Sequence, residues 1–200
     1  MERLKNILFS GVGGQGILLA SELTASSLLA AGYDVKKSEV HGMAQRGGSV
    51  TAQLRYGDRV YSPLIEPGCA DIQMAFEMME AVRYLPYLHK GSTVIVNTQK
   101  ILPPSVATGQ AVYPENILDE LIRRDILVIA VDAFSIAKQA GEVRTANVAL
   151  VGALSVHLPV EVSIFEEIIE KRVPERFRDE NMKAFAAGRD AGRQEEVGGR

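Results

Sequence analysis

The feature that most constrains this chain is a cluster of four glycines in six residues, Gly11-Val12-Gly13-Gly14-Gln15-Gly16. The cluster matches the pattern Gly-x-Gly-x-x-Gly. It follows a short apolar run at 6–10, typical of a buried strand, and precedes a helix-like stretch at 17–31 that ends at Gly32. In that context glycines allow a tight turn and let backbone N–H groups approach an anion at the helix N-terminus. We therefore predict a ligand-binding loop made of Gly11, Gly13, Gly14, Gln15 and Gly16. The alternative is that these glycines only let the first strand and the helix pack closely.

Strand-like and helix-like stretches alternate along the rest of the chain. Further strands are expected at 34–40, 71–76, 92–97 and 125–131, and helices at 77–88, 115–124, 147–157, 163–171 and 175–187. Residues 49–55 and 59–64 flank Tyr56-Gly57-Asp58, which indicates a β-hairpin. This order predicts an α/β fold, a doubly wound and mostly parallel (Rossmann-like) sheet with an inserted β-hairpin and C-terminal helices.

The chain shows no linker, so we expect one domain over residues 1–187. Residues 188–200 are rich in glycine and charge and are expected to form a flexible C-terminal tail.

Composition narrows the class of protein. With 46% hydrophobic and 24% charged residues among 200, the chain is typical of a globular domain. A net charge of -3 argues against a nucleic-acid partner, which normally selects a strongly basic surface. No apolar run reaches the roughly 18 residues of a membrane span, and no signal peptide is recognisable. We expect a cytoplasmic protein with no membrane contact.

The chain carries little that would support chemistry by itself. Cys69 is its only cysteine, which excludes an internal disulfide and a self-contained iron–sulfur cluster. The three histidines are scattered and lack zinc-ligand spacing. We therefore expect no metal site and no catalytic residue set, and the chain is predicted to be one subunit of a larger enzyme.

A second loop, from His41 to Gly48, follows the strand expected at 34–40. Ligands of open α/β sheets bind at the carboxyl ends of strands, where this loop would lie. Arg46 can contact phosphate or carboxylate in a bidentate manner, and Gly47 and Gly48 let backbone amides approach a ligand. His41 can exchange a proton near neutral pH, and Gln45 adds an amide. The alternative is that Arg46 pairs with a local carboxylate and His41 is a structural hydrogen-bonding residue.

Two other functions stay open on these residues. Glu39 lies 23 positions after Gly16, near the roughly 20 expected for an acid that binds a ribose hydroxyl. A stand-alone NAD(P)-binding oxidoreductase is therefore one alternative. A ligand-binding regulatory module without chemistry is another.

Taken together, the two loops carry a resemblance to a known family. Gly11 to Gly16, followed by Glu39-Val40-His41-Gly42-Met43-Ala44-Gln45-Arg46-Gly47-Gly48-Ser49-Val50, resembles the gamma-type domain of 2-oxoacid:ferredoxin oxidoreductases. The second stretch is most similar to the small (beta) subunits of the indolepyruvate:ferredoxin branch. The resemblance covers residues 4 to 175, with further matches at Ala75-Phe76-Glu77, Glu80-Ala81, Val96-Asn97-Thr98, Asn147, Leu150 and Gly152-Ala153-Leu154.

The resemblance implies an activity that the chain shares with a partner. The complex would oxidatively decarboxylate an aryl 2-oxoacid such as indolepyruvate, with coenzyme A taking the acyl group and ferredoxin the electrons. Thiamine diphosphate and iron–sulfur clusters would belong to a large partner subunit. The sequence agrees, because Gly57-Asp58 is not followed by the Asn-Asn of a thiamine motif.

The resemblance also implies roles for the two loops. The gamma-type domain would help to bind coenzyme A, with phosphate contacts from Gly13, Gly14, Gln15 and Gly16 and positive charge from Arg46. Gln45 and His41 would shape the side that faces the partner. When the chain is isolated, an apolar patch left by the absent partner would favour a homodimer.

Overall fold

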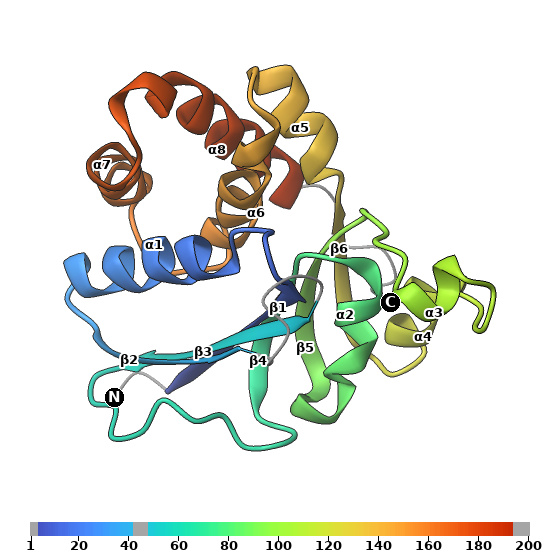
Figure 1. Ribbon diagram of the computed structural model, residues 1–200. Helices are drawn as coiled ribbons and strands as arrows, with labels where there is room; N and C mark the ends of the chain where they lie inside the picture. The colour runs from blue at the N-terminus through green and yellow to red at the C-terminus, as the bar shows by residue number, and fades with distance from the viewer. Residues whose placement is uncertain (1–3, 42–47, 194–200) are drawn as a thin grey trace.

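The computed structural model describes residues 4–41 and 48–193 and shows them folded around one six-stranded sheet (Figure 1). The strands lie in the order β2-β3-β1-β4-β5-β6. β1 is parallel to β4, β4 to β5 and β5 to β6, whereas β3 is antiparallel to both β1 and β2. Their bounds are β1 Lys5–Val12, β2 Asp34–His41, β3 Ser49–Gly57, β4 Ala70–Ala75, β5 Leu88–Asn97 and β6 Leu127–Val131.

Helices cover both faces of this sheet, which confirms the doubly wound α/β fold. Figure 1 shows α1 and α5 to α8 on one face and α2, α3 and α4 on the other. The α-helices are α1 Ile17–Ala30, α2 Met78–Arg83, α3 Pro104–Ala107, α4 Ile117–Ile122, α5 Ala133–Ala140, α6 Ala146–Ser155, α7 Val162–Arg172 and α8 Arg178–Gly192. Three short 3-10 helices join them: η1 Leu85–Tyr87, η2 Val143–Thr145 and η3 Glu175–Phe177.

Strand β1 is buried on both faces because it lies inside the sheet between the two helical layers. Ile7 and Phe9 belong to the core beneath α1 and α6, whereas Leu8 belongs to the core beneath α2 and α4. Successive side chains of a strand point to opposite faces, so the continuous apolar run at 6–10 is the pattern that a doubly covered strand requires.

The hairpin predicted between 49–55 and 59–64 is wrong. Residues 59–64 form no strand, and the antiparallel pair here joins β2 to β3, with Val40 opposite Thr51. Tyr61 and Leu64 are exposed, so a strand there would bury little apolar surface. Side chains of β2 and β3 bind this segment instead, since the Val60 N–H donates to Asp34 Oδ2 at 2.8 Å and the Ile65 N–H to Gln53 Oε1 at 2.6 Å.

Two helices differ from the sequence-based expectation in their length. The helix predicted over 77–88 stops at Arg83, and η1 with Pro86 inside it leads directly into β5. α8 continues to Gly192, beyond the domain end predicted at 187, whereas residues 194–200 of the predicted tail lie outside the described residues.

The extension of α8 follows from its contact with α6. Gly188 and Gly192 of α8 are buried, and a Cβ on Gly188 would stand 1.9 Å from the carbonyl oxygen of Ala149. The backbones of the two helices are therefore in direct contact at Gly188 and Gly192. Among the helices of residues 4–41 and 48–193, none combines the length and apolar character needed to span a bilayer.

Candidate functional site

A cavity of about 400 Å³ opens at the edge of the sheet where β1, β4, β5 and β6 end. β1 leads to α1 on one face and β4 leads to α2 on the other, so the cavity lies where the connections diverge. Open α/β sheets bind their ligands at such switch points. The cavity is lined by Gly14, Gln15, Gly16, Phe76, Asn97, Gln99, Ile101, Phe134, Val143, Arg144, Ala146, Asn147 and Leu150.

The first glycine loop forms one wall of this cavity, and its glycines are required by its shape. Gly14 and Gly16 have φ angles of +103° and +76°, in the left-handed region that disfavours other residues. A Cβ on Gly11 would lie 2.8 Å from Cβ of Phe76. The predicted strand–loop–helix unit is therefore confirmed, and the loop ends at the N-terminus of α1.

The two glycine-rich loops meet at this edge of the sheet. The N–H of Gly13 donates to the carbonyl of Gly48 at 2.9 Å, and Val12 stands opposite Ser49 in the β1–β3 ladder. His41 ends β2 opposite Val50. The predicted residues Gln45, Arg46 and Gly47 lie outside the described residues.

The side chain of Gln15 stabilises the first loop through hydrogen bonds to its backbone and to the residue that follows β4. Its Oε1 accepts the N–H of Val12 at 2.8 Å, and its Nε2 donates to the carbonyl of Phe76 at 2.8 Å. Its own N–H also donates to the carbonyl of Val12, so the side chain and the backbone amide of Gln15 both have protein partners. The N–H of Gly13 is bound to Gly48. Two backbone N–H groups of the loop, those of Gly14 and Gly16, therefore have no acceptor within the described residues.

Asparagines fix the other walls of the cavity. Asn97, almost fully buried at the end of β5, donates to the carbonyl of Phe76 at 3.1 Å and accepts the N–H of Ala133 at 3.3 Å. Asn147, in the first turn of α6, donates to the carbonyl of Gly16 at 3.3 Å. These bonds join β5, α5 and α6 to the rim, so the cavity has a defined shape without a ligand.

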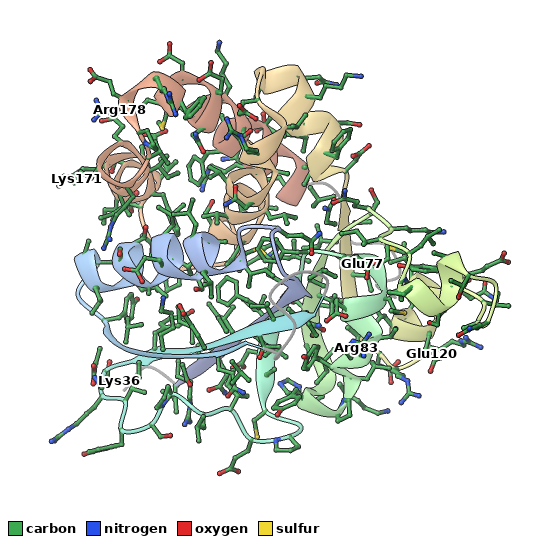
Figure 2. The ribbon with its side chains drawn as sticks, viewed as in Figure 1. Lys36, Glu77, Arg83, Glu120, Lys171 and Arg178 are labelled. Carbon is green, nitrogen blue, oxygen red and sulfur yellow. The ribbon has the colours of Figure 1, made fainter. Side chains whose placement is uncertain are left out.

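A buried acid, Glu77, holds the wall that follows β5 (Figure 2). Its Oε2 caps α2 by accepting the N–H of Met79 at 2.7 Å. Its Oε1 accepts the N–H of Ile101 at 3.0 Å and the hydroxyl of Tyr113. Burial and the bond to Glu77 raise the pKa of Tyr113, so its hydroxyl stays protonated as the donor.

Arg144 supplies the charge in the cavity lining, and the sequence analysis did not identify it. Its Nε and Nη2 donate to the two carboxylate oxygens of Glu142 at 3.0 and 2.8 Å. This pair lowers the pKa of Glu142 to about 2. α1 and α6 both begin at the cavity, and neither has an acidic residue in its first turn, so their dipoles add positive potential.

Glu39, which the sequence spacing suggested as a ligand of a ribose hydroxyl, has another role. Glu39 lies on the edge strand β2, with β3 between it and β1, and its carboxylate pairs with Lys37 at 2.7 Å. Lys37 also binds Glu22 of α1 at 2.7 Å. Glu39 therefore belongs to the contact between β2 and α1, which removes one of the two observations that permitted an NAD(P) site. Within the described residues, no group of three or more His, Cys, Asp or Glu side chains is arranged to hold a metal ion.

The fold and the rim cavity define an open α/β domain whose first glycine loop and helix N-termini favour a phosphate-bearing ligand. The chain belongs to the pyruvate ferredoxin/flavodoxin oxidoreductase family, whose model matches residues 6–191.

Curated relatives of similar length support this membership. Indolepyruvate oxidoreductase subunit IorB of Pyrococcus horikoshii is 43% identical, over 94% of this chain and 96% of the relative. The subunit of the same name from Archaeoglobus fulgidus is 45% identical over 92% of each chain.

Solved structures share the fold. The gamma subunit of a keto/oxoacid ferredoxin oxidoreductase from Geobacter sulfurreducens matches with a TM-score of 0.70 and 26% identity, over 94% of this chain and 98% of that one. A 2-oxoglutarate:ferredoxin oxidoreductase from Magnetococcus marinus, solved with 2-oxoglutarate, coenzyme A and succinyl-CoA, matches with a TM-score of 0.73 and 19% identity. That match covers 96% of this chain and 31% of that one, so the corresponding unit is part of a longer chain there.

Proposed function

We propose that this chain is the small subunit of a cytoplasmic indolepyruvate:ferredoxin oxidoreductase. The complex cleaves the bond between the carboxyl and keto carbons of an aryl 2-oxoacid, releases CO₂ and joins the acyl group to the sulfur of coenzyme A. The electron pair passes to ferredoxin. The observation that carries this proposal is the 43–45% identity to IorB subunits over nearly the full length of both chains.

The chemistry divides between this chain and a large partner subunit. With one cysteine, the chain lacks the thiolates for a cluster of its own. Thiamine diphosphate and the iron–sulfur clusters are therefore assigned to the partner, where thiamine diphosphate supplies the electron sink. The role left to this chain is to bind and orient a substrate at the joint active site.

We assign coenzyme A to the rim cavity. Its phosphates would bind the amides of Gly14 and Gly16 at the N-terminus of α1, and Arg46 of the second loop would add charge. His41, Gln45, Gly47 and Gly48 would complete the side next to the partner.

Apolar side chains around the cavity are the surface that we assign to that partner. Phe134 and Val143 line the cavity and are about half exposed, and Leu102 beside it is equally exposed. Burial of such side chains is favourable. The isolated chain is therefore expected to cover them by forming a homodimer, which sedimentation of the chain with and without its partner measures.

The main experiment is anaerobic co-expression of the chain with a candidate large subunit from the same genome. We expect stable co-purification and reduction of ferredoxin that needs both indolepyruvate and coenzyme A. Omission of the chain should abolish this activity. Full activity of the large subunit alone would favour a regulatory module, and turnover by the isolated chain would contradict the subunit assignment.

A pair of glycine variants tests the coenzyme A site. Gly14 and Gly32 have nearly equal φ angles, +103° and +95°, and at both a Cβ would meet open space. Gly14→Ala and Gly32→Ala thus carry the same backbone strain, but Gly14 alone of the two lines the cavity. Gly14→Ala and Arg46→Ala should raise the apparent KM for coenzyme A, and Gly32→Ala should not. Equal values for all three would refute the assignment.

A further inference from the structure

A surface segment without charge follows β5. Residues 101–114 contain no Asp, Glu, Lys or Arg, although 24% of the chain is charged. The other uncharged stretches of more than ten residues contain most of β1, α1 and α6, which carry much of the core: 6–21, 23–33 and 145–160. The segment after β5 differs from them, because none of residues 102–112 is buried. Residues 102–112 are called the uncharged arm here.

The uncharged arm has a defined backbone structure although it contributes no buried residue. The carbonyl of Pro103 accepts the N–H groups of residues 106 and 107 at 2.9 Å, which forms α3. The carbonyl of Ser105 accepts the N–H groups of residues 110 and 111 at 2.8 and 3.0 Å, which folds the chain back. Figure 1 shows α3 and the turn after it standing out at the side of the molecule, next to α4. The arm therefore keeps its shape through its own hydrogen bonds.

Both ends of the arm are fixed by one carboxylate, that of Glu77. Its Oε1 accepts the N–H of Ile101, directly before the arm, at 3.0 Å, and the hydroxyl of Tyr113, directly after the arm. Glu77 and Tyr113 are buried, so water does not compete for these bonds. A buried carboxylate is unfavourable unless it is hydrogen-bonded. Here its bonds join the two ends of a surface segment, so the arm is held in one position.

This combination is typical of a protein interface. The centre of an interface is depleted in charged residues. A segment that is already fixed at both ends also loses less conformational entropy when a partner binds it. The arm adjoins the rim cavity, because Gln99 and Ile101 line that cavity and Leu102 is the first residue of the arm. A partner that completes the rim would therefore cover the arm as well.

We propose that the uncharged arm is a docking element for the large partner subunit, which receives it in an apolar groove without charge. The inference rests on the proposed function, under which the large subunit completes the site at the rim. Leu102 and Val112 are the anchors, because they are the large apolar side chains of the arm that are exposed, at 54% and 88%. Their burial on association is favourable. A charge at either position would be left unpaired in the groove.

The test measures the dissociation constant between the two subunits. The large subunit is titrated anaerobically with this chain, and ferredoxin reduction reports the complex. Val112→Glu and Leu102→Glu should each raise the dissociation constant by about tenfold or more, because an unpaired charge enters an apolar contact. At saturating concentrations of this chain, kcat and the KM for coenzyme A should equal those of the wild type, because neither residue lines the rim cavity.

Tyr61→Glu and Leu64→Glu are the matched controls. These residues are 82% and 58% exposed, close to the two anchors, and lie in the segment between β3 and β4. The same charge at these positions should leave the dissociation constant unchanged. Hydrogen exchange of the wild-type chain gives a second measurement without any substitution. Formation of the complex should slow amide exchange over residues 102–112 and leave residues 59–64 unchanged.

The outcomes separate this proposal from the proposed function. If the arm variants bind the large subunit as tightly as the wild type or the controls do, the docking role is wrong and the subunit assignment stands. The docking role is also wrong if the substitutions weaken only the self-association of the isolated chain, since the arm would then face a second copy. A wild-type chain that does not bind the large subunit would overturn both.

Discussion

Asn147 and Gly16 lie in contact although 131 residues separate them. Nδ2 of Asn147 donates to the carbonyl of Gly16 at 3.3 Å, and a Cβ on Gly16 would stand 2.4 Å from that same nitrogen. The first turn of α6 is thus seated directly on the loop that begins α1. Both residues line the rim cavity, so this contact joins two of its walls.

The contact predicts that alanine destabilises the fold more at Gly16 than at Gly14. Gly16→Ala adds a clash with Asn147 to the strain of a positive φ, and we expect it to lower the free energy of unfolding by about 2–4 kcal/mol. Gly14→Ala carries the strain alone and should cost about 1–2 kcal/mol. Urea unfolding of the purified chains compares them. If the two variants lose equal free energy of unfolding, the contact with Asn147 does not contribute to the cost of Gly16→Ala.

A double variant isolates the same contact. Asn147→Ala removes Nδ2 and Cγ, the two nearest atoms that a Cβ on Gly16 would meet, so Gly16→Ala should cost less in that background. Strict additivity of the two changes would show that they do not interact.

The contact between α6 and α8 makes a second prediction, in which helix propensity gives the wrong sign. Changing an exposed glycine inside a helix to alanine normally raises the free energy of unfolding by about 1 kcal/mol. At Gly188, however, the added Cβ would stand 1.9 Å from the carbonyl oxygen of Ala149, so the helices must separate. We expect Gly188→Ala to lower the free energy of unfolding by about 2–5 kcal/mol. At the exposed neighbour Ala187 the reverse change, Ala187→Gly, should cost only about 1 kcal/mol. A stabilising Gly188→Ala would contradict the close approach.

Short-range patterns in the sequence predicted the part of the fold that depends on neighbours in the chain. The first strand, the glycine loop and α1 are adjacent in sequence, and each ends at residues with a strong conformational preference. The helix over Ala133–Ala140 was missed although both of its ends are marked. Asp132 accepts the N–H of Ser135 at 3.0 Å, and Gly141 closes the helix at a φ of +105°. These capping residues were the available signal.

What could not be predicted depends on contacts between distant segments. The strand over Ser49–Gly57 was recognised by its composition, but its partners, β1 and β2, follow from the packing of α1 on the sheet. Arg144 lies in no motif, and it lines the rim cavity only because η2 lies at the rim directly before α6. The first glycine loop was found because glycines at this spacing between a strand and a helix form a recognisable pattern. Asn97, Asn147 and Glu77 were among the matches to the family, but their contacts in the cavity walls depend on distant segments.

Glu77 is predicted to hold the cavity wall at residue 101. Glu77→Gln places an NH₂ group where a carboxylate oxygen accepted N–H or O–H donors, and it should lower the free energy of unfolding by about 2–4 kcal/mol. Protease cleavage between residues 98 and 112 should become faster as Ile101 and Tyr113 lose their acceptor. Glu120→Gln, at an exposed pair on α4 (Figure 2), is the control and should change neither. Unchanged cleavage in Glu77→Gln would mean that the wall is held by other contacts.

The pair of Glu142 and Arg144 makes a prediction about pH. Hydrogen bonds from the Arg144 side chain and then from its backbone N–H hold the pKa of Glu142 at about 2, below its usual 4.5. A lowered carboxyl pKa means that the pair stabilises the fold above pH 4.5 and that this contribution is lost as the pH falls from there towards 2. A carboxyl-detected NMR titration should therefore give Glu142 a midpoint near 2, and Arg144→Ala should return it towards 4.5. Glu120, whose pKa is lowered by Arg124, should titrate identically in both proteins. A Glu142 midpoint that does not move in Arg144→Ala would show that the guanidinium is not paired with this carboxylate.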